Sequence, residues 1–249
     1  MFNINNIKTA IIFGAGHGIG LEISKRILYL NPNAKILCTY RNTKKAHKLI
    51  ENNSLKSFRV DPSTEEDILT FKEEVKNMQI SKFDLILNSI GFLHDHETMP
   101  EKSLRDVNLK NFQKLMNINS FITLNLAHHF IDMLHRDTSS VFLAISAKVG
   151  SIEDNRMGGW YSYRASKAAL NMILKNISIE LGRKNKNSII LSIHPGTTDT
   201  ELSSPFTKNT PYKLHTPEQT AENILNTING LDQDSNGKFL TYEGEEIPW

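Results

Sequence analysis

The sequence contains one cysteine, carries almost no net charge and has no long hydrophobic run. Cys38 alone cannot form an intramolecular disulfide, which fits a reducing compartment. The formal net charge is +2, so charge gives no indication of a nucleic acid or membrane partner. No apolar stretch approaches the ~20 residues that cross a bilayer, and no apolar segment follows a basic region at the N-terminus, as in a secretion signal. We therefore expect a cytoplasmic protein without nucleic acid or membrane partners.

Short apolar runs alternate with segments of helical periodicity along all 249 residues. This alternation is typical of an α/β protein with a parallel sheet covered by helices. The length fits one such domain or two small ones, and the absence of repeats, linkers and low-complexity tracts favours a single domain over residues 1–249. Strands are expected at 9–13, 36–40, 57–60, 83–87, 141–145, 188–193 and 239–242.

A glycine-rich turn follows the first expected strand. Four glycines stand within seven residues, and a helix with apolar residues on one face begins there. Strand, glycine turn and helix together form a phosphate cradle, because glycines let the backbone approach the anion and the helix N-terminus attracts it. An ordinary tight turn is the alternative, and the number and place of the glycines make the cradle the better interpretation. The expected cofactor-binding residues of this turn are Gly14, His17, Gly18, Ile19 and Gly20.

The residues after the second expected strand bear on the choice of cofactor. In dinucleotide folds a carboxylate here binds the adenosine ribose, whereas an arginine accommodates a 2′-phosphate. The sequence has Arg41 and no carboxylate, which favours NADP(H) over NAD(H), although a solvated loop arginine is the alternative. His17 is a weaker candidate for the same phosphate, and Asp61, after the third strand, is a candidate for the adenine edge.

A tyrosine and a lysine four residues apart open a later helix. Tyr163 and Lys167 lie on one face at this spacing. A free tyrosine titrates near pH ~10, and a nearby ammonium favours the phenolate and lowers that value. A tyrosine tuned in this way acts as general acid or base on an alcohol or carbonyl. The spacing alone is a weak signal, because Tyr40 and Lys44 share it.

Further polar residues fall where ligands of a parallel sheet bind, at or after the carboxyl ends of strands. Asn119 is separate from these, since it lies on the apolar face of a helix expected over 112–130, where a buried asparagine requires partners. Asn88 is expected to bond the backbone of neighbouring strands. The candidates that follow strands are Asn88, Gly91, Ser146, Pro195, Gly196, Thr198 and Thr200.

The remaining loops carry no recognisable code for a substrate. His94-Asp95-His96 invites a metal interpretation, but no third ligand stands at a supportive spacing, so we expect no metal. Residues 205–217 are polar, aperiodic and flanked by prolines, which predicts a mobile lid. The substrate pocket is expected from segments 92–106, 150–160 and 203–215.

Together these motifs resemble the classical short-chain dehydrogenase/reductase family over nearly the whole chain. The glycine turn, Asn88-Ser89-Ile90-Gly91, Asn119, the Tyr163–Lys167 pair and Pro195-Gly196 stand in that family's order. The stretches 150–155 and 158–164 and the closing Ile247-Pro248-Trp249 are similar to its C-factor-like and carbonyl-reductase-like branch.

The resemblance implies a Rossmann-type doubly wound parallel sheet of about seven strands in the order 3-2-1-4-5-6-7, with helices on both faces. A nicotinamide cofactor would lie across its carboxyl edge. Tyr163 would be the acid/base, Lys167 would lower its pKa and hold the ribose, and Asn119 would match the family's structural and catalytic asparagine.

The sequence departs from the family pattern at three places. Phe13 stands where a threonine usually opens the glycine motif, and Ser89-Ile90 replace the usual Asn-Ala. The family's catalytic serine normally stands three residues before a glycine. Counting back from Gly150 gives Ala147, with Ser146 one place earlier. Neighbouring residues at a strand end point opposite ways, so either the backbone turns Ser146 inward or no serine polarises the substrate.

The sequence therefore predicts an NADP(H)-dependent oxidoreductase that interconverts a small-molecule carbonyl and an alcohol. A cofactor-binding signalling or regulatory protein with little turnover is the alternative, motivated by Ala147. A sugar-nucleotide epimerase is disfavoured, because the chain is short for the extra substrate domain. The apolar faces of the Asn119 and Tyr163 helices either pair subunits into a homodimer or homotetramer or cover the sheet.

Overall fold

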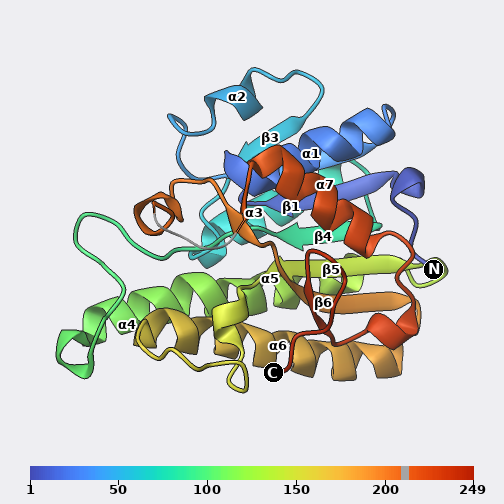
Figure 1. Ribbon diagram of the computed structural model, residues 1–249. Coiled ribbons are helices and arrows are strands. Elements are labelled where there is room, and N and C mark those ends of the chain that lie inside the picture. The colour runs from blue at the N-terminus through green and yellow to red at the C-terminus, as the bar shows by residue number, and fades with distance from the viewer. Residues whose placement is uncertain (209–212) are drawn as a thin grey trace.

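A computed structural model describes residues 1–208 and 213–249 of the chain (Figure 1). Its centre is a seven-stranded sheet in the order β3-β2-β1-β4-β5-β6-β9, in which every neighbouring pair is parallel. This confirms the strand order and the Rossmann-type doubly wound fold expected from the sequence. The strands of the sheet are β1 (Thr9–Phe13), β2 (Lys35–Tyr40), β3 (Lys56–Arg59), β4 (Leu85–Asn88), β5 (Ser140–Ile145), β6 (Ser188–His194) and β9 (Phe239–Thr241).

A separate parallel pair lies beyond the end of β6. It consists of β7 (Thr197–Thr198) and β8 (Leu214–His215). The segment expected to form a lid, residues 205–217, follows β7 and contains β8, and its residues 209–212 lie outside the described residues. The described part of that segment includes a 3-10 turn over Ser204–Phe206.

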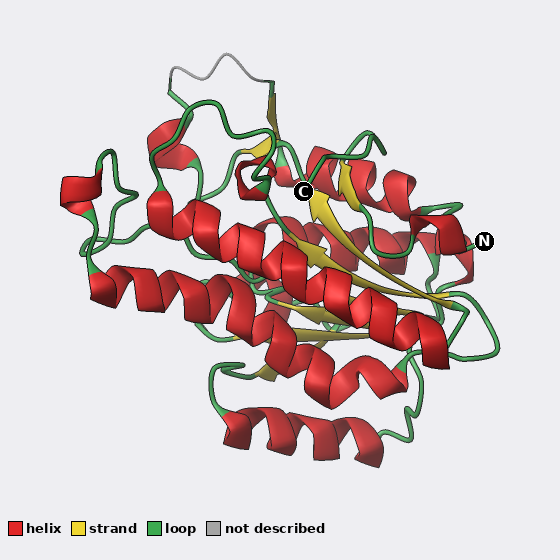
Figure 2. Cartoon of the chain, turned by 90° about the horizontal axis from the view of Figure 1, so that it is seen from below, coloured by secondary structure: helices red, strands yellow, loops and turns green. Residues whose placement is uncertain are grey.

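Helices cover both faces of the sheet, as Figure 1 shows from the side and Figure 2 from below. One face is covered by α1 and α7, and the other by α3, α5 and α6. A π-helical turn, Asn117–Phe121, joins α4 to α5. The helices are α1 (Gly18–Leu30), α2 (His47–Ile50), α3 (Glu65–Asn77), α4 (Leu109–Met116), α5 (Ile122–Phe130), α6 (Tyr161–Lys184) and α7 (Pro217–Ile228). None of the described helices is both long and apolar enough to span a membrane.

The strands are apolar on both sides because both faces of the sheet are covered. Along β5, Leu143 belongs to the core beneath α1 and α7, whereas Phe142 belongs to the core beneath α3, α5 and α6. In β6 the same alternation places Ile190 beneath α6, and Ser192 follows two residues later on that face. The carboxyl ends of the strands meet at one edge, where the candidate site lies.

Aromatic packing explains one of the departures from the family pattern. Phe13, at the end of β1, is fully buried in the core beneath α3 and α5. Its ring lies 6.1 Å from that of Phe71 and 5.3 Å from that of Phe130, and the last two rings are 5.8 Å apart. Offset and edge-to-face aromatic pairs add stability beyond their buried area. Phe13 therefore anchors the strand that leads into the glycine turn.

Several element boundaries differ from those expected by one residue, and two elements differ by more. β4 begins at Leu85 and not at Phe83, whose backbone makes only an isolated bridge to Leu134. The helix expected over 112–130 starts at Leu109 and contains the π-helical turn, which periodicity alone does not reveal.

We predict that Phe71→Ala lowers the free energy of unfolding by about 3–5 kcal/mol, as is usual for a buried phenylalanine. Phe71 is 1% exposed and its ring packs against three others. Leu69→Ala, on the exposed face of the same helix, is the matched control and should change stability by less than about 1 kcal/mol because Leu69 is 47% exposed. Urea unfolding followed by circular dichroism measures both. Equal losses for the two variants would contradict this account of the core.

Candidate active site

The glycine turn lies between β1 and α1 and has the close packing of a phosphate cradle. Gly14 and Gly18 have φ angles of +81° and +62°, which residues with a Cβ rarely adopt. A Cβ on Gly20 would lie 2.3 Å from Ser89 Oγ and 2.8 Å from the Gly14 carbonyl oxygen. His17, the residue before α1, is extended and its side chain does not cap the helix. The first backbone N–H groups of α1 are therefore left for an anion.

Ser89 holds this turn from the next strand. Its hydroxyl donates to the carbonyl oxygens of Phe13 and Gly14 at 2.8 and 3.1 Å, and its backbone N–H donates to Phe13 at 2.9 Å. Ser89 stands where the family usually has asparagine. In this chain it fixes the geometry of the cradle.

The end of β2 presents a basic side chain, as expected. Arg41 is 66% exposed, and its guanidinium lies 3.9 Å from the carboxylate of Asp61 at the end of β3. The Asp61 carboxylate also accepts hydrogen bonds from the backbone and hydroxyl of Ser63. The two residues face each other across the edge of the sheet where an adenosine ribose is expected.

Tyr163 and Lys167 lie side by side near the start of α6, and both are buried. Tyr163 is 6% exposed and Lys167 is 2% exposed. The Lys167 Nζ lies 5.9 Å from the centroid of the Tyr163 ring and donates to the carbonyl oxygen of Ile145, at the end of β5, at 3.0 Å. A glycine leaves room for the lysine, because a Cβ on Gly150 would lie 2.8 Å from Lys167 Cβ. Gly91 also lies beside the ammonium, since a Cβ there would be in ordinary contact with Nζ at 3.7 Å.

Burial controls the protonation of this pair. It raises the pKa of Tyr163 far above its ordinary value of 10.0 and lowers the pKa of Lys167 from 10.5 to about 8. The prediction that Lys167 lowers the pKa of Tyr163 is wrong for this structure. Its ammonium donates to a backbone carbonyl, and removing the phenolate from water outweighs the attraction of the lysine.

Asn119 ties three segments together beneath the pair. It is fully buried, lies in the π-helical turn and exchanges two hydrogen bonds with the backbone of Phe92, at 2.7 and 2.8 Å. Its amide also donates to the hydroxyl of Ser166 at 2.9 Å, which in turn donates to the Tyr163 carbonyl at 2.8 Å. The wider turn of a π-helix is frequent at functional sites. Asn119 therefore positions α6, which carries Tyr163 and Lys167, relative to the loop after β4.

Two polar residues make contacts other than those expected. Asn88 was expected to bond the backbone of neighbouring strands. Its amide instead donates to Thr123 of α5 at 2.8 Å, and its side-chain oxygen accepts from the backbone of Ile90 at 3.0 Å. Thr198 was expected to offer its hydroxyl at the cofactor, but that hydroxyl bonds to Thr220 of α7 at 2.8 Å. The Asn88 and Thr198 side chains therefore link the edge of the sheet to α5 and α7.

The end of β5 shows where the side chains of Ser146 and Ala147 point. The Ser146 hydroxyl donates to the side-chain oxygen of Asn171 at 2.7 Å, beneath α6, and Ser146 is 2% exposed. Ala147 follows with an extended backbone, so its side chain points the other way. It packs in the cluster that contains Tyr163. Of the two alternatives left by the sequence, the geometry supports the one in which no serine lies beside Tyr163.

The Pro195–Gly196 turn follows β6. Gly196 has a φ of +76°, and a Cβ there would lie 2.9 Å from the ring of Tyr242. Thr200 follows in the same segment, and its hydroxyl lies 3.3 Å from that of Ser203. Its methyl group would lie 3.6 Å from a Cβ on Gly18. The segment after β7 therefore reaches the glycine turn.

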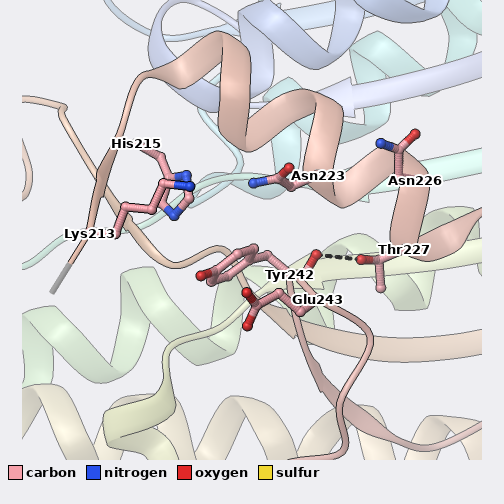
Figure 3. Close-up of a pocket in the computed structure, with 7 residues that line it drawn as sticks. All are labelled: Lys213, His215, Asn223, Asn226, Thr227, Tyr242 and Glu243. Carbon is pink, nitrogen blue, oxygen red and sulfur yellow. Dashed lines mark hydrogen bonds between the residues drawn. The ribbon is translucent and has the colours of Figure 1, made fainter.

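A separate cleft of about 410 Å³ lies behind this turn (Figure 3). The rings of Tyr242 and His215 pack edge to face with centroids 4.9 Å apart and support Gly196 from the back. The lining residues are Lys213, His215, Asn223, Asn226, Thr227, Tyr242 and Glu243. Tyr163 is not among them, so this cleft is distinct from the site around Tyr163.

Apolar side chains pack in one cluster with Tyr163. The Trp160 ring lies 6.0 Å from that of Tyr163 and 5.0 Å from that of Phe206. The other members of this cluster are Phe92, Leu93, Leu115, Ala147, Val149 and Leu202. Each of the three segments expected to build the pocket contributes to the cluster, through Phe92 and Leu93, Trp160, and Phe206, whereas Leu115, Ala147, Val149 and Leu202 lie outside those segments. Such a wall suits an apolar substrate.

The turn that leads into α6 is left-handed at three consecutive residues. Gly158, Gly159 and Trp160 have φ angles of +64°, +65° and +51°. Glu101, a buried residue of the loop after β4, fixes this turn: its backbone carbonyl accepts from Trp160 at 2.6 Å and its carboxylate accepts from the backbone and hydroxyl of Ser162. A carboxylate at a helix N-terminus is also favoured by the helix dipole. This arrangement sets the position of Tyr163.

The His94-Asp95-His96 stretch has structural contacts. Asp95 accepts hydrogen bonds from Lys114, which lower the pKa of its carboxyl to about 2, and His94 Nε2 lies 3.0 Å from the carbonyl oxygen of Glu201. Within residues 1–208 and 213–249, no group of three or more potential ligands gathers into a metal site.

Sequence reasoning missed Ser166 and Glu101. Ser166 has a local signal, since it lies on the buried face of α6 between Tyr163 and Lys167. Glu101 has none, because it is a single acid in an aperiodic loop whose partner is 61 residues away. The arrangement as a whole places a phosphate cradle, a buried phenol and a buried ammonium along one edge of a parallel sheet.

Comparison with known proteins agrees with this geometry. A sequence profile for the short chain dehydrogenase family matches residues 8–211. The chain is 29% identical over 147 residues to the C-signal protein of Myxococcus xanthus, covering 59% of this chain and 84% of that protein. It is 24% identical to an uncharacterised oxidoreductase of Schizosaccharomyces pombe, covering 97% and 98% of the two chains.

Solved structures share the fold. The carbonyl reductase Sniffer of D. melanogaster superposes with a TM-score of 0.86 at 21% identity, over 98% of this chain and 100% of that one. An NADPH-bound carbonyl reductase from chicken fatty liver gives a TM-score of 0.86 at 23% identity, over 98% and 94%. Since the family profile spans well over half of the sequence and includes its glycine turn and Tyr163–Lys167 pair, the chain belongs to the short chain dehydrogenase family of oxidoreductases.

Proposed function

We propose that this protein is an NADP(H)-dependent oxidoreductase that interconverts a carbonyl and an alcohol, with Tyr163 as the acid/base. The observation that carries the proposal is the Tyr163–Lys167 pair, buried at the carboxyl ends of the strands on the same edge as the glycine turn. The NADPH-bound reductase with the same fold supports the cofactor assignment. Residues 1–249 would act as one NAD(P)-binding domain.

The residues of this edge fit a dinucleotide phosphate. Gly14, Gly18 and Gly20 let the backbone approach the pyrophosphate, which the N-terminus of α1 would attract. The residues directly after β2 include Arg41 and no acidic residue. Arg41 would bind the 2′-phosphate that distinguishes NADP(H) from NAD(H). The Pro195–Gly196 turn and Thr200 would face the nicotinamide half, and Lys167 would donate to the ribose.

A bound NADPH supplies the hydride. In the reducing direction Tyr163 donates its proton to the carbonyl oxygen as negative charge develops there. The raised pKa of Tyr163 keeps the phenol protonated at neutral pH, as an acid requires. Lys167 places positive charge near the resulting phenolate, and Asn119 holds the helix that carries both residues.

The substrate pocket has one donor fewer than the family pattern. Ala147 occupies the serine position, so Tyr163 would polarise the substrate oxygen without that hydroxyl. Loss of one such donor typically reduces the rate by about 10²–10³. The aromatic and aliphatic wall formed by Phe92, Trp160 and Phe206 suits an apolar carbonyl compound.

A regulatory protein that binds the cofactor with little turnover is the second candidate. Ala147 favours it, as does the burial of Tyr163 under Trp160 and Phe206. NADPH consumption over a panel of aldehydes, ketones and quinones separates the two functions. Tight NADPH binding without turnover on any of them would support the regulatory protein.

The proposal also includes self-association of the chain and a cytoplasmic location. Leu124 on α5 and Met172 and Ile179 on α6 are 43%, 61% and 48% exposed, which is unusual for large apolar side chains on adjacent helices. They suit a homodimer or homotetramer. A cytoplasmic location stays a prediction from cysteine usage.

We predict that Tyr163→Phe lowers kcat for carbonyl reduction about 10²- to 10⁴-fold, the typical contribution of general acid catalysis. NADPH binding should be retained, since the substitution removes one hydroxyl and no phosphate contact. Stopped-flow turnover and fluorescence titration measure the two effects. Turnover that survives the substitution would assign proton transfer to another group.

We predict that Ala147→Ser raises kcat about 10-fold or more on an unactivated ketone, because a hydroxyl at this position restores an oxyanion donor. Ser146→Ala is the matched control. It should leave kcat nearly unchanged while lowering stability by about 1–3 kcal/mol, since it leaves Asn171 without its partner. Steady-state kinetics and urea unfolding test both variants. A large loss of kcat in Ser146→Ala would show that Ser146 is the catalytic serine after all.

We predict that NADPH affinity falls as pH rises above about 8. The pKa of Lys167 is lowered to about 8, so its ammonium is present below that pH and is lost above it. The dissociation constant should rise up to about 10-fold per pH unit beyond this point, as for one titrating group. Lys167→Met should show a weaker and nearly pH-independent affinity from pH 7 to 9.5. An unchanged slope in that variant would exclude Lys167 as the titrating group.

A further inference from the structure

Buried polar atoms without a hydrogen-bond partner gather between α6 and β6. Among residues 1–208 and 213–249, four buried side-chain nitrogen or oxygen atoms have no partner. Three of them are Asn171 Nδ2 on α6 and, on β6, Ser192 Oγ and His194 Nδ1. The fourth, His129 Nε2, belongs to α5. Because a buried polar atom without a partner is costly, three such atoms on facing elements indicate a bound molecule that they share.

The two strand residues face α6. Side chains alternate along a strand, so Ser192 and His194 share the face of Ile190, which lies in the core beneath α6. On the neighbouring strand β5, Ala144 is the partner of Ser192. Ser146, two residues further along β5, therefore lies beside His194 on the same face. The carboxyl ends of β5 and β6 thus present three polar side chains to one helix.

A bridge between α6 and β6 fixes how the two elements lie against each other. Only residues 185–187 join them, so the chain reverses there and the helix and the strand run antiparallel. The Asn236 amide donates to the carbonyl oxygen of Ser178 at 3.1 Å, and its side-chain oxygen accepts from the backbone of Ile190 at 2.9 Å. Ser178 and Ile190 are therefore level with each other.

Asn171 lies at a level between the two strand residues. Measured from the bridge, it is about 10 Å along the helix toward the carboxyl edge of the sheet, at about 1.5 Å per residue. Ser192 and His194 are about 7 and 13 Å along the strand in the same direction, at about 3.3 Å per residue. The hydrogen bond from the Ser146 hydroxyl to Asn171 Oδ1, at 2.7 Å, agrees with this placement. The three unpartnered atoms therefore lie close together.

A single water molecule would satisfy all three atoms. Burial lowers the pKa of His194 to about 4, with Lys148 adding to this shift and Asp154 opposing it, so the imidazole is neutral at neutral pH. A water oxygen can accept from Asn171 Nδ2 and from the Ser192 hydroxyl, and the water can donate to His194 Nδ1. Buried waters typically make about three such bonds. A cation would face the N–H groups of the amide, so water is the better occupant.

We propose that these three atoms bind an internal water molecule between α6 and β6, and that Asn171 is thereby a positioning residue for Tyr163 and Lys167. The positioning role rests on the proposed function of the protein, whereas the water site does not. Tyr163, Lys167 and Asn171 follow one another at intervals of four residues, so they lie along one face of α6. Asn171 holds that face to β5 through Ser146 and to β6 through the water.

The effect of Ser192→Ala on stability tests the water site by its sign. A hydroxyl that bonds a water stabilises the fold, so its removal should raise the equilibrium constant of unfolding about 2- to 10-fold, as for one net hydrogen bond. A hydroxyl without any partner destabilises the fold, and its removal would lower that constant. Urea unfolding measures the difference. A stabilised variant, or a high-resolution crystal structure of the wild-type protein without a water between these atoms, overturns the proposal.

The positioning role is tested by Asn171→Ala. We expect kcat for NADPH-dependent carbonyl reduction to fall about 10- to 100-fold, the range for a misplacement of up to about 1 Å. The NADPH dissociation constant should be nearly unchanged, because the phosphate cradle belongs to β1 and α1. Ser192→Ala, which keeps the bond between Ser146 and Asn171, should lower kcat by a smaller factor. Ser178→Ala, on the same buried face of α6 but further from Tyr163, is the matched control and should keep the wild-type kcat.

The two parts of the proposal fail separately. If neither Asn171→Ala nor Ser192→Ala has a lower kcat than Ser178→Ala, Asn171 has no positioning role. Wild-type protein without turnover on any carbonyl compound overturns the proposed function, and the water site is then still decided by the stability of Ser192→Ala and by the crystal structure.

Discussion

The structure of the site depends on the burial of one ammonium group at the end of a β-strand. Burying a charge is costly unless it is paired or hydrogen-bonded. Lys167 meets this condition through the Ile145 carbonyl, which is free to accept because β5 ends there. The close approach also requires Gly150, since a Cβ there would lie 2.8 Å from Lys167 Cβ. The parallel sheet, the crossing of α6 and this glycine are therefore parts of one arrangement.

The same edge of the sheet explains why the residues proposed to bind the cofactor and to act in catalysis lie together. The glycine turn follows β1, Gly91 follows β4, and the Pro195–Gly196 turn follows β6. In a parallel sheet these chain reversals all fall on one side. Ser89 and Asn119 then link neighbouring segments by hydrogen bonds, so that the phosphate cradle and the catalytic helix are held in a fixed relation.

The features that the sequence predicted are those with local signals. Hydrophobic periodicity was sufficient to locate the strands and to place Asn119 on the buried face, because both depend on patterns within one element, whereas the strand order was implied by the family resemblance. The partner of Asn88 lies 35 residues away in α5, and that of Glu101 lies 61 residues away, so neither was accessible from spacing. A shift of one residue along β5 would move the Ser146 side chain to the opposite face of the sheet, so its direction could not be predicted from the sequence. The pKa of Tyr163 depends on burial by segments distant in the sequence, which the Tyr–Lys spacing does not report.

The left-handed turn at 158–160 restricts how this protein can be redesigned. Gly158 and Gly159 tolerate positive φ at little cost, whereas Trp160 adopts it under strain that its surroundings must offset. Grafting a loop from a related reductase to alter selectivity would therefore have to retain the Gly-Gly dipeptide and its anchor at Glu101. A graft without them would displace the first turn of α6, and the new selectivity would come with a misplaced phenol.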